Sequence, residues 1–244
     1  MKPIVFCWSG GKDSALALDA VQRAGEYEVV SLLTTVTADY DRISMHGVRR
    51  ALLHAQARAL GLPVQEVLIP KDASNDIYEA QMGVALADWH RKGVETMAFG
   101  DIFLEDLRAY RERNLAKLDM RALFPIWKIP TPELMQDFIA RGFRAVTVCI
   151  DTRQLTDVWV GRNLDADFVR ELPAAVDPCG ENGEFHSYVY DAPNFAAPIA
   201  FTLGERVWRD SFLFQDLIPQ GLHEPEAGAD SSGSSRPLAL QGDI

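Results

Sequence analysis

The segment CWSGGKDSAL, residues 7–16, gathers two glycines, a lysine and two serine hydroxyls within a few positions. The apolar run 3–6 precedes it, and the residues of 15–21 follow with helical spacing. The segment is therefore expected to connect a buried strand to a helix. Such a junction is a natural place to bind an anion, because the first N–H groups of a helix have no partner within the helix.

The residue types of this loop indicate which anion it would bind. Gly10 and Gly11 allow backbone N–H groups to turn toward one point and allow a ligand to approach closely. Lys12 and the hydroxyls of Ser9 and Ser14 add further donors around that point. We therefore predict that this loop binds a phosphate chain.

A simpler explanation is a tight turn in which Asp13 or Ser14 caps the helix. That explanation leaves the second glycine, the second serine and Lys12 without a role. Two common phosphate loops do not fit: Lys12 is followed by Asp13, which breaks GxxxxGK[ST], and no GxGxxG is present. Asp13 is therefore assigned to the phosphate-binding loop with its neighbours.

The overall composition is that of an ordinary globular protein. The 244 residues include 48% hydrophobic and 24% charged residues, without the run of roughly 18 apolar residues that a membrane span needs. No signal-peptide pattern opens the sequence, so a cytoplasmic location and no membrane partner are expected. The net charge of −11 argues against a protein held mainly by nucleic-acid phosphates. Cys7, Cys149 and Cys179 lack the CxxC spacing of a zinc or iron–sulfur site.

Short apolar runs alternate with longer amphipathic ones through the first 150 residues, which is typical of a parallel sheet covered by helices. The predicted strands span residues 3–8, 28–36, 64–69, 94–99, 123–127 and 145–150. The predicted helices span residues 12–24, 48–60, 73–92, 105–118 and 131–141. The expected fold class is α/β, with a parallel, doubly wound sheet.

The pattern changes beyond this region. A short helix at 165–172 is followed by strand-like alternation at 185–190 and 199–214. The final stretch is rich in serine, glycine and acidic residues, which predicts disorder. The expected parts are a first domain over 1–151, a smaller C-terminal α+β domain over 152–223, and a disordered tail over 224–244.

Polar segments collect where the predicted strands end. SGGKDS, TADYDR, PKD, GDI and CIDTR follow the first, second, third, fourth and sixth strands. Parallel strands place their carboxyl ends at one edge of a sheet, where ligands bind. We therefore expect these five segments to share one crevice.

The glycine loop resembles the SGGxDS pyrophosphate loop of the ATP pyrophosphatase (PP-loop) superfamily, in which the loop also follows the first strand. Members of that superfamily cleave ATP between its α and β phosphates and activate a substrate as an adenylate. The resemblance implies the HUP-like fold of adenine nucleotide alpha hydrolases. It also implies that ATP binds here with Mg²⁺.

Four further segments are similar to the family of diphthine–ammonia ligases and their bacterial relatives. They are SMHGVR at 44–49, FGDI at 99–102, PIW at 125–127 and DPCGENGEFH at 177–186. The resemblance implies a PP-loop domain joined to a smaller C-terminal domain that faces the ATP site. It also implies AMP-forming chemistry, in which ammonia or another amine converts an adenylated carboxylate into an amide.

The last of these segments departs from the diphthamide-making members, which read EGGE(Y/F)ET. This chain reads GENGEFHS, with Asn182, His186 and Ser187 replacing parts of that pattern. The variant resembles the bacterial branch, whereas diphthamide is made on an archaeal and eukaryotic elongation factor. The resemblance therefore implies a carboxylate substrate other than diphthine, whose identity the sequence does not give.

The acidic candidates each have a functional and a structural explanation. Asp101, preceded by Gly100, could bind the Mg²⁺ that accompanies ATP, or it could cap the next helix. Glu181 and Glu184 flank an Asn-Gly turn and could hold a cation, orient an amine or accept its proton. The alternative for these two glutamates is a solvated acidic turn.

The basic candidates are two histidines and an arginine. His46 and His186 could transfer a proton near neutral pH. Arg49 stands at a predicted helix start, where a cation is mildly unfavourable, and this placement indicates an anionic partner. We assign His46, Arg49 and Asn182 to substrate binding. The catalytic candidates are Lys12, Glu181, Glu184 and His186.

Together these observations predict an ATP-dependent, AMP-forming ligase that joins a carboxylate, free or protein-borne, to ammonia or another amine. A homodimer is compatible with this prediction. Two alternatives remain open. One is a tRNA-modifying enzyme of the same superfamily, for which paired cysteines or a basic surface would be expected. The other is a regulator that binds ATP without turning it over.

Overall fold

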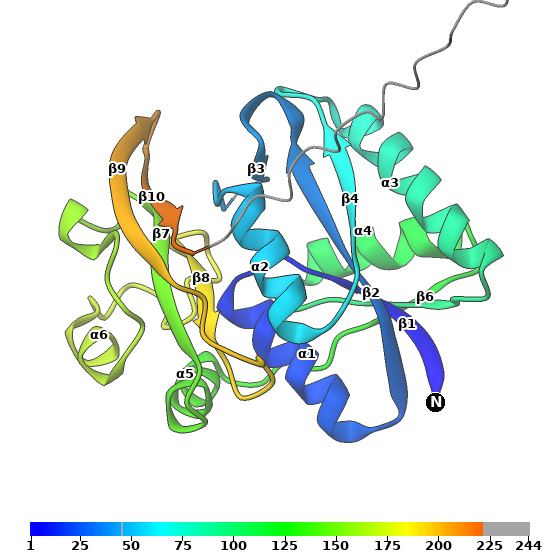
Figure 1. Ribbon diagram of the computed structural model, residues 1–244, viewed down its shortest axis with the longest axis horizontal. Helices are drawn as coiled ribbons and strands as arrows, with labels where there is room; N and C mark the ends of the chain where they lie inside the picture. The colour runs from blue at the N-terminus through cyan, green and yellow to red at the C-terminus, as the bar shows by residue number, and fades with distance from the viewer. Residues whose placement is uncertain (45, 222–244) are drawn as a thin grey trace, which may run out of the picture.

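The computed structural model describes residues 1–44 and 46–221. In this part of the chain, a mostly parallel sheet and a smaller antiparallel sheet lie on either side of α1 (Lys12–Ala24) and α2 (Arg50–Leu60), as Figure 1 shows. No described helix is both long enough and apolar enough to cross a membrane.

The first sheet has six strands in the order β3-β2-β1-β5-β6, with β4 also paired to β2. All of its pairings are parallel except that of β3. The strands are β1 (Lys2–Cys7), β2 (Tyr27–Thr37), β3 (Arg42–Ile43), β4 (Val64–Ile69), β5 (Thr96–Ala98) and β6 (Arg121–Leu123). The predicted α/β class with a doubly wound parallel sheet is therefore confirmed.

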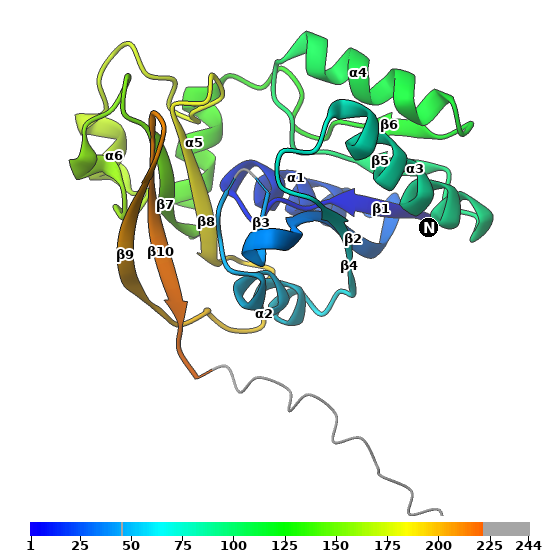
Figure 2. The same ribbon diagram turned by 90° about the horizontal axis from the view of Figure 1, so that it is seen from above.

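Alternation along β1 explains why this sheet is covered on both faces. Ile4 and Phe6 point into a core shared with α1 and α2. Val5 packs in a separate core on the opposite face, against α3 (Asn75–Arg91) and α4 (Glu105–Ala116). Figure 2 shows α3 and α4 on the side of the sheet away from α2.

The second sheet is antiparallel, with the order β8-β7-β10-β9. Its strands are β7 (Arg144–Asp151), β8 (Phe185–Asp191), β9 (Phe201–Arg209) and β10 (Phe212–Pro219), accompanied by α5 (Thr131–Ala140) and α6 (Ala166–Glu171). Its buried residues continue the core of α1 and α2. The two sheets therefore pack around one shared core.

The strand predicted at 145–150 forms, but its predicted place in the parallel sheet is wrong. β7 is buried along almost its whole length, so its sequence is as apolar as that of a parallel strand. It pairs in antiparallel fashion with β8 and β10. The two sheets thus divide the chain between β6 and β7 and not after residue 151. The predicted tail at 224–244 lies outside the described residues.

The strand predicted at 123–127 is also displaced. β6 ends at Leu123, and the chain then turns, with the Trp127 N–H donating to the Phe124 carbonyl oxygen at 3.2 Å. Pro125 has no N–H to donate to a neighbouring strand, which favours a turn over a longer strand.

A buried glutamine joins the two sheets at the glycine loop. The Nε2 of Gln56, on α2, donates to the carbonyl oxygens of Gly10 at 2.9 Å and Val189 at 2.7 Å. Its Oε1 accepts from Trp8 Nε1 at 2.9 Å. The Val189 N–H also donates to the Gly10 carbonyl oxygen at 2.9 Å. The loop after β1 is therefore bonded directly to β8 of the second sheet.

The substitution Gln56→Leu tests this connection, because leucine keeps much of the volume and removes all three hydrogen bonds. We expect the free energy of unfolding in urea to fall by roughly 1–3 kcal/mol for each buried group left without a partner. Gln81→Leu, at an exposed position on α3, is the control and should change the same quantity by less than about 0.5 kcal/mol. Equal effects of the two substitutions would contradict the assigned role of Gln56.

Candidate active site

A cavity of about 590 Å³ lies where the glycine loop faces the second sheet. Its volume is within the range of about 300–1,000 Å³ that is usual for small-molecule sites. The lining comes mainly from the loop after β1, from the segment that follows β5, and from the segment that leads into β8. The predicted site residues that line it are Ser9, Lys12, Asp13, Ser14, His46, Gly100, Asp101, Glu181, Asn182 and His186.

The glycines of the loop allow the surrounding parts to pack closely. Gly10 has a φ of +79°, and a Cβ there would lie 2.6 Å from Gln56 Oε1. A Cβ on Gly11 would lie 2.8 Å from His46 Cε1. At Gly100, a Cβ would lie 2.8 Å from the backbone nitrogen of Ser14. Gly10 and Gly11 are not among the lining residues, so their side-chain positions face the protein and not the cavity.

Lys12 is the cation of the loop, and its side chain is almost fully buried. Its Nζ lies 2.8 Å from Asp13 Oδ2. Burial acts to lower the pKa of Lys12, but Asp13 and, to a smaller extent, Cys179 and Glu181 together outweigh burial, and the pKa is raised. Lys12 therefore stays charged. Its backbone N–H donates to Ser187 Oγ at 3.1 Å, which ties the start of α1 to β8.

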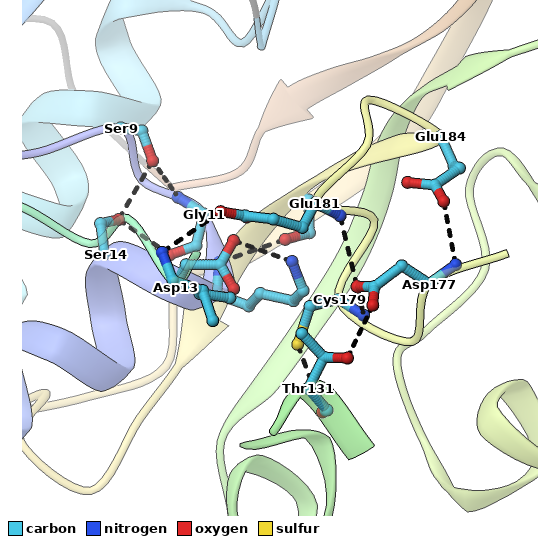
Figure 3. Close-up of polar contacts among 12 residues, drawn as sticks. Ser9, Gly11, Asp13, Ser14, Thr131, Asp177, Cys179, Glu181 and Glu184 are labelled. Carbon is cyan, nitrogen blue, oxygen red and sulfur yellow. Dashed lines mark hydrogen bonds and ion pairs between the residues drawn. The ribbon is translucent and has the colours of Figure 1, made fainter. Parts of the chain in front are cut away.

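The hydroxyls of the loop form a short chain beside Lys12. Ser9 Oγ and Ser14 Oγ are 3.1 Å apart, and Ser14 Oγ donates to the Gly11 carbonyl oxygen at 2.9 Å. The Gly11 N–H donates to Ser9 Oγ at 3.2 Å. Figure 3 shows this chain facing the segment that carries Glu181. Both hydroxyls line the cavity and can turn toward a ligand that binds there.

Asp177 holds the segment opposite the loop, residues 177–184, in place through hydrogen bonds. Its carboxylate accepts from the backbone N–H groups of Cys179 at 2.8 Å and Glu181 at 3.3 Å, and from Thr131 Oγ1 at 2.6 Å. The Sγ of Cys179 lies 3.5 Å from the Thr131 carbonyl oxygen. Burial raises the pKa of Cys179 well above its ordinary value, so this thiol is not a nucleophile near neutral pH.

Glu184 also stabilises the segment 177–184 through hydrogen bonds to its backbone. Its carboxylate accepts from the backbone N–H groups of Asp177 and Asn182, both at 2.9 Å, and from Asn182 Nδ2 at 3.2 Å. It is 1% exposed and does not line the cavity. In Figure 3 it lies beside Asp177, away from the glycine loop. Glu184 is thus placed to position the segment and not to touch a ligand.

Glu181 points the other way, toward Asp13, as Figure 3 shows. Its Oε1 accepts from the Ile102 N–H at 3.2 Å, which joins this segment to the chain after β5. Burial, with a smaller contribution from the negative charge of Asp13, raises the pKa of Glu181 to about 7. Glu181 can therefore exchange a proton near neutral pH.

His46 and His186 meet at one wall of the cavity, with ring centroids 4.9 Å apart. His46 Nδ1 lies 3.1 Å from the Ser187 carbonyl oxygen. Burial lowers the pKa of His46 to about 3, and the neighbouring His186 adds to this effect. Burial also lowers the pKa of His186 to about 4. Both imidazoles are therefore neutral at physiological pH.

Asp101 lies in the cavity with a partner that the sequence interpretation missed. Arg111 Nε is 2.6 Å from Asp101 Oδ2, and the guanidinium stacks 4.3 Å from the ring centroid of Phe99. Position 111 follows Leu104 and Leu107 at helical spacing, and this pattern could have indicated an inward-facing arginine. The alternative role of Asp101 as a cap is wrong, since the N-cap residue of α4 is Leu104.

The lining carboxylates are compatible with a cation that is bound mainly by phosphates. The described residues contain no cluster of three His, Cys, Asp or Glu side chains that could hold a metal alone. Asp13 Oδ1 is buried without a hydrogen-bond partner among these residues. Mg²⁺ usually takes one or two protein carboxylates together with substrate phosphates, and Asp13 and Asp101 can supply them.

Arg49 lies outside the cavity. Its Nη2 and Nε lie 2.6 and 3.0 Å from the carboxylate oxygens of Asp216, on β10. Arg42 Nη1 lies 2.8 Å from the same carboxylate. The anionic partner that the sequence indicated is therefore an aspartate of the second sheet. This arginine pair links the sheets and does not contact a ligand in the cavity.

Only two of the five polar segments at the strand ends meet in the cavity, the loop after β1 and the segment after β5. The segments after β2 and β4 pair with each other elsewhere, through the Lys71 N–H and Asp39 Oδ2 at 2.6 Å. Asp151 belongs to the second sheet and binds Arg153 at 2.7 Å. The single shared crevice predicted for all five is therefore wrong.

The two glutamates should respond differently to the loss of their charge. Glu184→Gln replaces one acceptor oxygen by a donor amide that faces backbone N–H groups, so we expect unfolding free energy to fall by about 1–3 kcal/mol. Glu181→Gln removes a carboxylate that burial disfavours, so the free energy should change by less than about 1 kcal/mol. Urea unfolding at pH 8 measures both. A larger loss for Glu181→Gln would contradict the assigned roles.

Two family models match this chain, one over each of its two sheets. Residues 1–122 match the model of the diphthamide synthase N-terminal domain, and residues 130–218 match that of the diphthamide synthase C-terminal domain. The chain is 25% identical to the diphthine–ammonia ligase of Bos taurus and 26% identical to that of Danio rerio. These alignments cover 84% of this chain and 85% and 88% of the two relatives.

Two further similarities are more limited. The chain is 25% identical to the diphthine–ammonia ligase of Schizosaccharomyces pombe, over 83% of this chain but only 36% of that protein. A solved structure described as a predicted subunit of a tRNA methyltransferase from Methanocaldococcus jannaschii superposes with a TM-score of 0.38 and 13% identity, over 64% of this chain and 82% of its own.

The two domain models together span both sheets and the cavity between them, and the chain belongs to the diphthamide synthase family.

Proposed function

We propose that this protein is an ATP-dependent ligase that forms AMP and pyrophosphate while it converts a carboxylate into an amide, with ammonia or another amine. The membership of the family supports an ATP-dependent amidation, as do the relatives named diphthine–ammonia ligase. The observation that carries the proposal is the cavity in which the glycine loop faces Glu181 and His186.

In the first step, a substrate carboxylate oxygen attacks the α phosphorus of ATP, and the bond from that phosphorus to pyrophosphate breaks. We assign Ser9, Ser14 and the N–H groups of Asp13 and Ser14, in the first turn of α1, to the β and γ phosphates. Lys12 offsets the negative charge that builds on the departing pyrophosphate. The products of this step are an acyl adenylate and pyrophosphate.

Mg²⁺ would supply further charge compensation for the phosphates. The residues that would hold it are Asp101 and Asp13, whose Oδ1 is buried without a partner among the described residues.

In the second step, the amine nitrogen attacks the carbonyl carbon of the adenylate, the carbon–oxygen bond to AMP breaks, and the nitrogen loses a proton. Glu181 is the candidate acceptor of that proton, because it lines the cavity and its pKa is raised by burial to about 7. Phe185 and Phe212 cover the same cavity from the second sheet and would limit hydrolysis of the adenylate by water.

We also propose that the carboxylate differs from diphthine. His186 and Ser187 line the cavity. At these two positions this chain departs from the EGGE(Y/F)ET pattern of the diphthamide-making members. A change of side chains on the wall of a site changes which substrates bind there. Fractionation of a small-molecule extract is the route to the identity of the substrate.

The lysine of the loop gives the first test of the reaction. Wild type is incubated with ATP, Mg²⁺, ammonium and an extract of the source cells, beside Lys12→Ala. We expect extract-dependent AMP and pyrophosphate from wild type, and a rate at least about 100-fold lower from Lys12→Ala, since a preorganised charge at the transition state is lost.

The nature of the products separates the alternatives. Loop-dependent ADP and phosphate would contradict the proposed mechanism. Tight ATP binding without turnover in any extract fraction would favour a regulator. Lys71→Ala, at an exposed position away from the cavity, is the matched control and should act like wild type.

The pH dependence tests Glu181. Its carboxylate accepts a proton only when ionised, so its contribution should be absent well below pH 7 and grow as the pH rises through about 7. The ratio of the amide-forming rates of wild type and Glu181→Gln at each pH cancels the ionisation of the amine. We expect that ratio to rise from about 4 at pH 5.5 to about 100 at pH 8.5. A ratio that does not change with pH would exclude Glu181 as the base.

A further inference from the structure

The lining of the cavity is short of free positive charge for a polyphosphate. Its two permanent cations, Lys12 and Arg111, face the carboxylates of Asp13 and Asp101 and the carboxyl group of Glu181, which is partly ionised near neutral pH. Each cation is already paired, Lys12 with Asp13 at 2.8 Å and Arg111 with Asp101 at 2.6 Å. A nucleotide triphosphate that binds here, even with Mg²⁺, brings further negative charge into this lining.

The two histidines are the remaining side chains of the lining that can gain positive charge. His46 comes from the segment before α2 and His186 from β8, and their ring centroids are 4.9 Å apart. The Ser187 carbonyl oxygen can only accept, so His46 Nδ1, at 3.1 Å, carries the hydrogen. His46 Nε2 is then left with a lone pair that can take a proton.

The histidine pair also lies against the phosphate-binding loop. His46 Cε1 would be 2.8 Å from a Cβ on Gly11, so the imidazole abuts the loop backbone. Ser187, which accepts from His46, accepts the backbone N–H of Lys12 through its Oγ at 3.1 Å. A phosphate held by the loop would therefore lie close to the His46 imidazole, and the His186 ring is 4.9 Å from that imidazole.

Without a ligand, the surroundings keep the pair neutral. Burial is the main cause of the lowered pKa values of His46 and His186, and Lys12 contributes to both. An added anion reverses the balance, because an opposite charge nearby favours the protonated form. The ionisable groups that share the cavity with the pair are Cys7, Lys12 and Asp13 near the loop, Asp101 after β5, Arg111 on α4, and Cys179 and Glu181 before β8.

We propose that His46 and His186 are conditional cations of the nucleotide site: the pair is neutral when the site is free, and takes up one proton from solvent when a polyphosphate binds at the loop. This inference rests on the proposed function for the identity of the ligand. One proton is expected, and not two, because the second imidazolium would be repelled by the first across 4.9 Å. The proton returns to solvent when pyrophosphate leaves.

The sign of the pH effect follows from this exchange. The bound state holds a proton that the free state lacks, so nucleotide affinity rises as the pH falls through the raised pKa of the bound pair. The increase continues until the pKa of the free histidines, about 3 and about 4, is reached. Affinity is expected to change by up to about tenfold per pH unit for one proton taken up.

The nucleotide analogue α,β-methylene ATP cannot be cleaved between its α and β phosphates. Titration calorimetry with this analogue and Mg²⁺ measures the number of protons taken up on binding. At pH 6.5, the apparent binding enthalpy is compared between buffers of different ionisation enthalpy. We expect wild type to take up about one proton more than the double variant His46→Asn/His186→Asn. His90→Asn, at an exposed position on α3, is the matched control and should equal wild type.

Three outcomes separate the explanations. The inference is overturned if the double variant retains the proton uptake of wild type; loss of that uptake in Glu181→Gln would then assign the proton to Glu181. Failure of wild type to bind the nucleotide at all would refute the proposed function instead, and this inference with it. Proton uptake that is lost only in the histidine variants supports the inference.

Nuclear magnetic resonance of wild type gives a test that does not depend on the folding of a variant. The Cε1–H signals of the two buried histidines should remain those of neutral imidazole down to pH 5 in the free protein. With α,β-methylene ATP and Mg²⁺ bound, one of the two should shift to the imidazolium position at pH 6.5. Two signals that stay neutral in the bound protein would overturn the inference.

Discussion

The carbonyl oxygen of Gly10 is the point on which the site depends. It accepts both the Val189 N–H at 2.9 Å and Gln56 Nε2 at 2.9 Å, so the loop of the first sheet is bonded to β8 of the second. The left-handed φ of Gly10, +79°, turns that carbonyl toward β8. The start of α1 is held in the same way, by the Lys12 N–H and Ser187 Oγ. With both attachments in place, the two sheets enclose one cavity.

Each half of the chain supplies what the other lacks. The first sheet brings the hydroxyls and the cation that suit phosphate, and the second brings Glu181 and His186. The burial that encloses the cavity raises the pKa of Glu181 to about 7 and lowers that of His186 to about 4. Burial therefore disfavours the charged form of both groups, and a charged ligand that enters the cavity can change their protonation.

Sequence reasoning was most successful where the signal is local. The helix predicted at 12–24 and the strand at 64–69 have the bounds of α1 and β4, because glycines flank the helix and prolines flank the strand. β7 was placed in the wrong sheet because burial on both faces looks the same in parallel and antiparallel strands. Glu181 and Glu184 could not be told apart, since the sequence does not show that the first carboxylate accepts from the Ile102 N–H and the second from the Asp177 N–H. The helical spacing of Arg111 could have indicated that it faces inward, but its pairing with Asp101 depends on how α4 packs, which the sequence does not show.

If the proposed function is right, the loop after β1 and the segment that leads into β8 together form one nucleotide site. A crystal structure of the complex with α,β-methylene ATP and Mg²⁺ would show this site. We expect β and γ phosphate oxygens within about 3.2 Å of Lys12 Nζ and of the hydroxyls of Ser9 and Ser14. We also expect Glu181 and His186 to face the α phosphate across the cavity. Phosphates bound away from the loop, or a nucleotide with no contact to the second sheet, would refute a joint site.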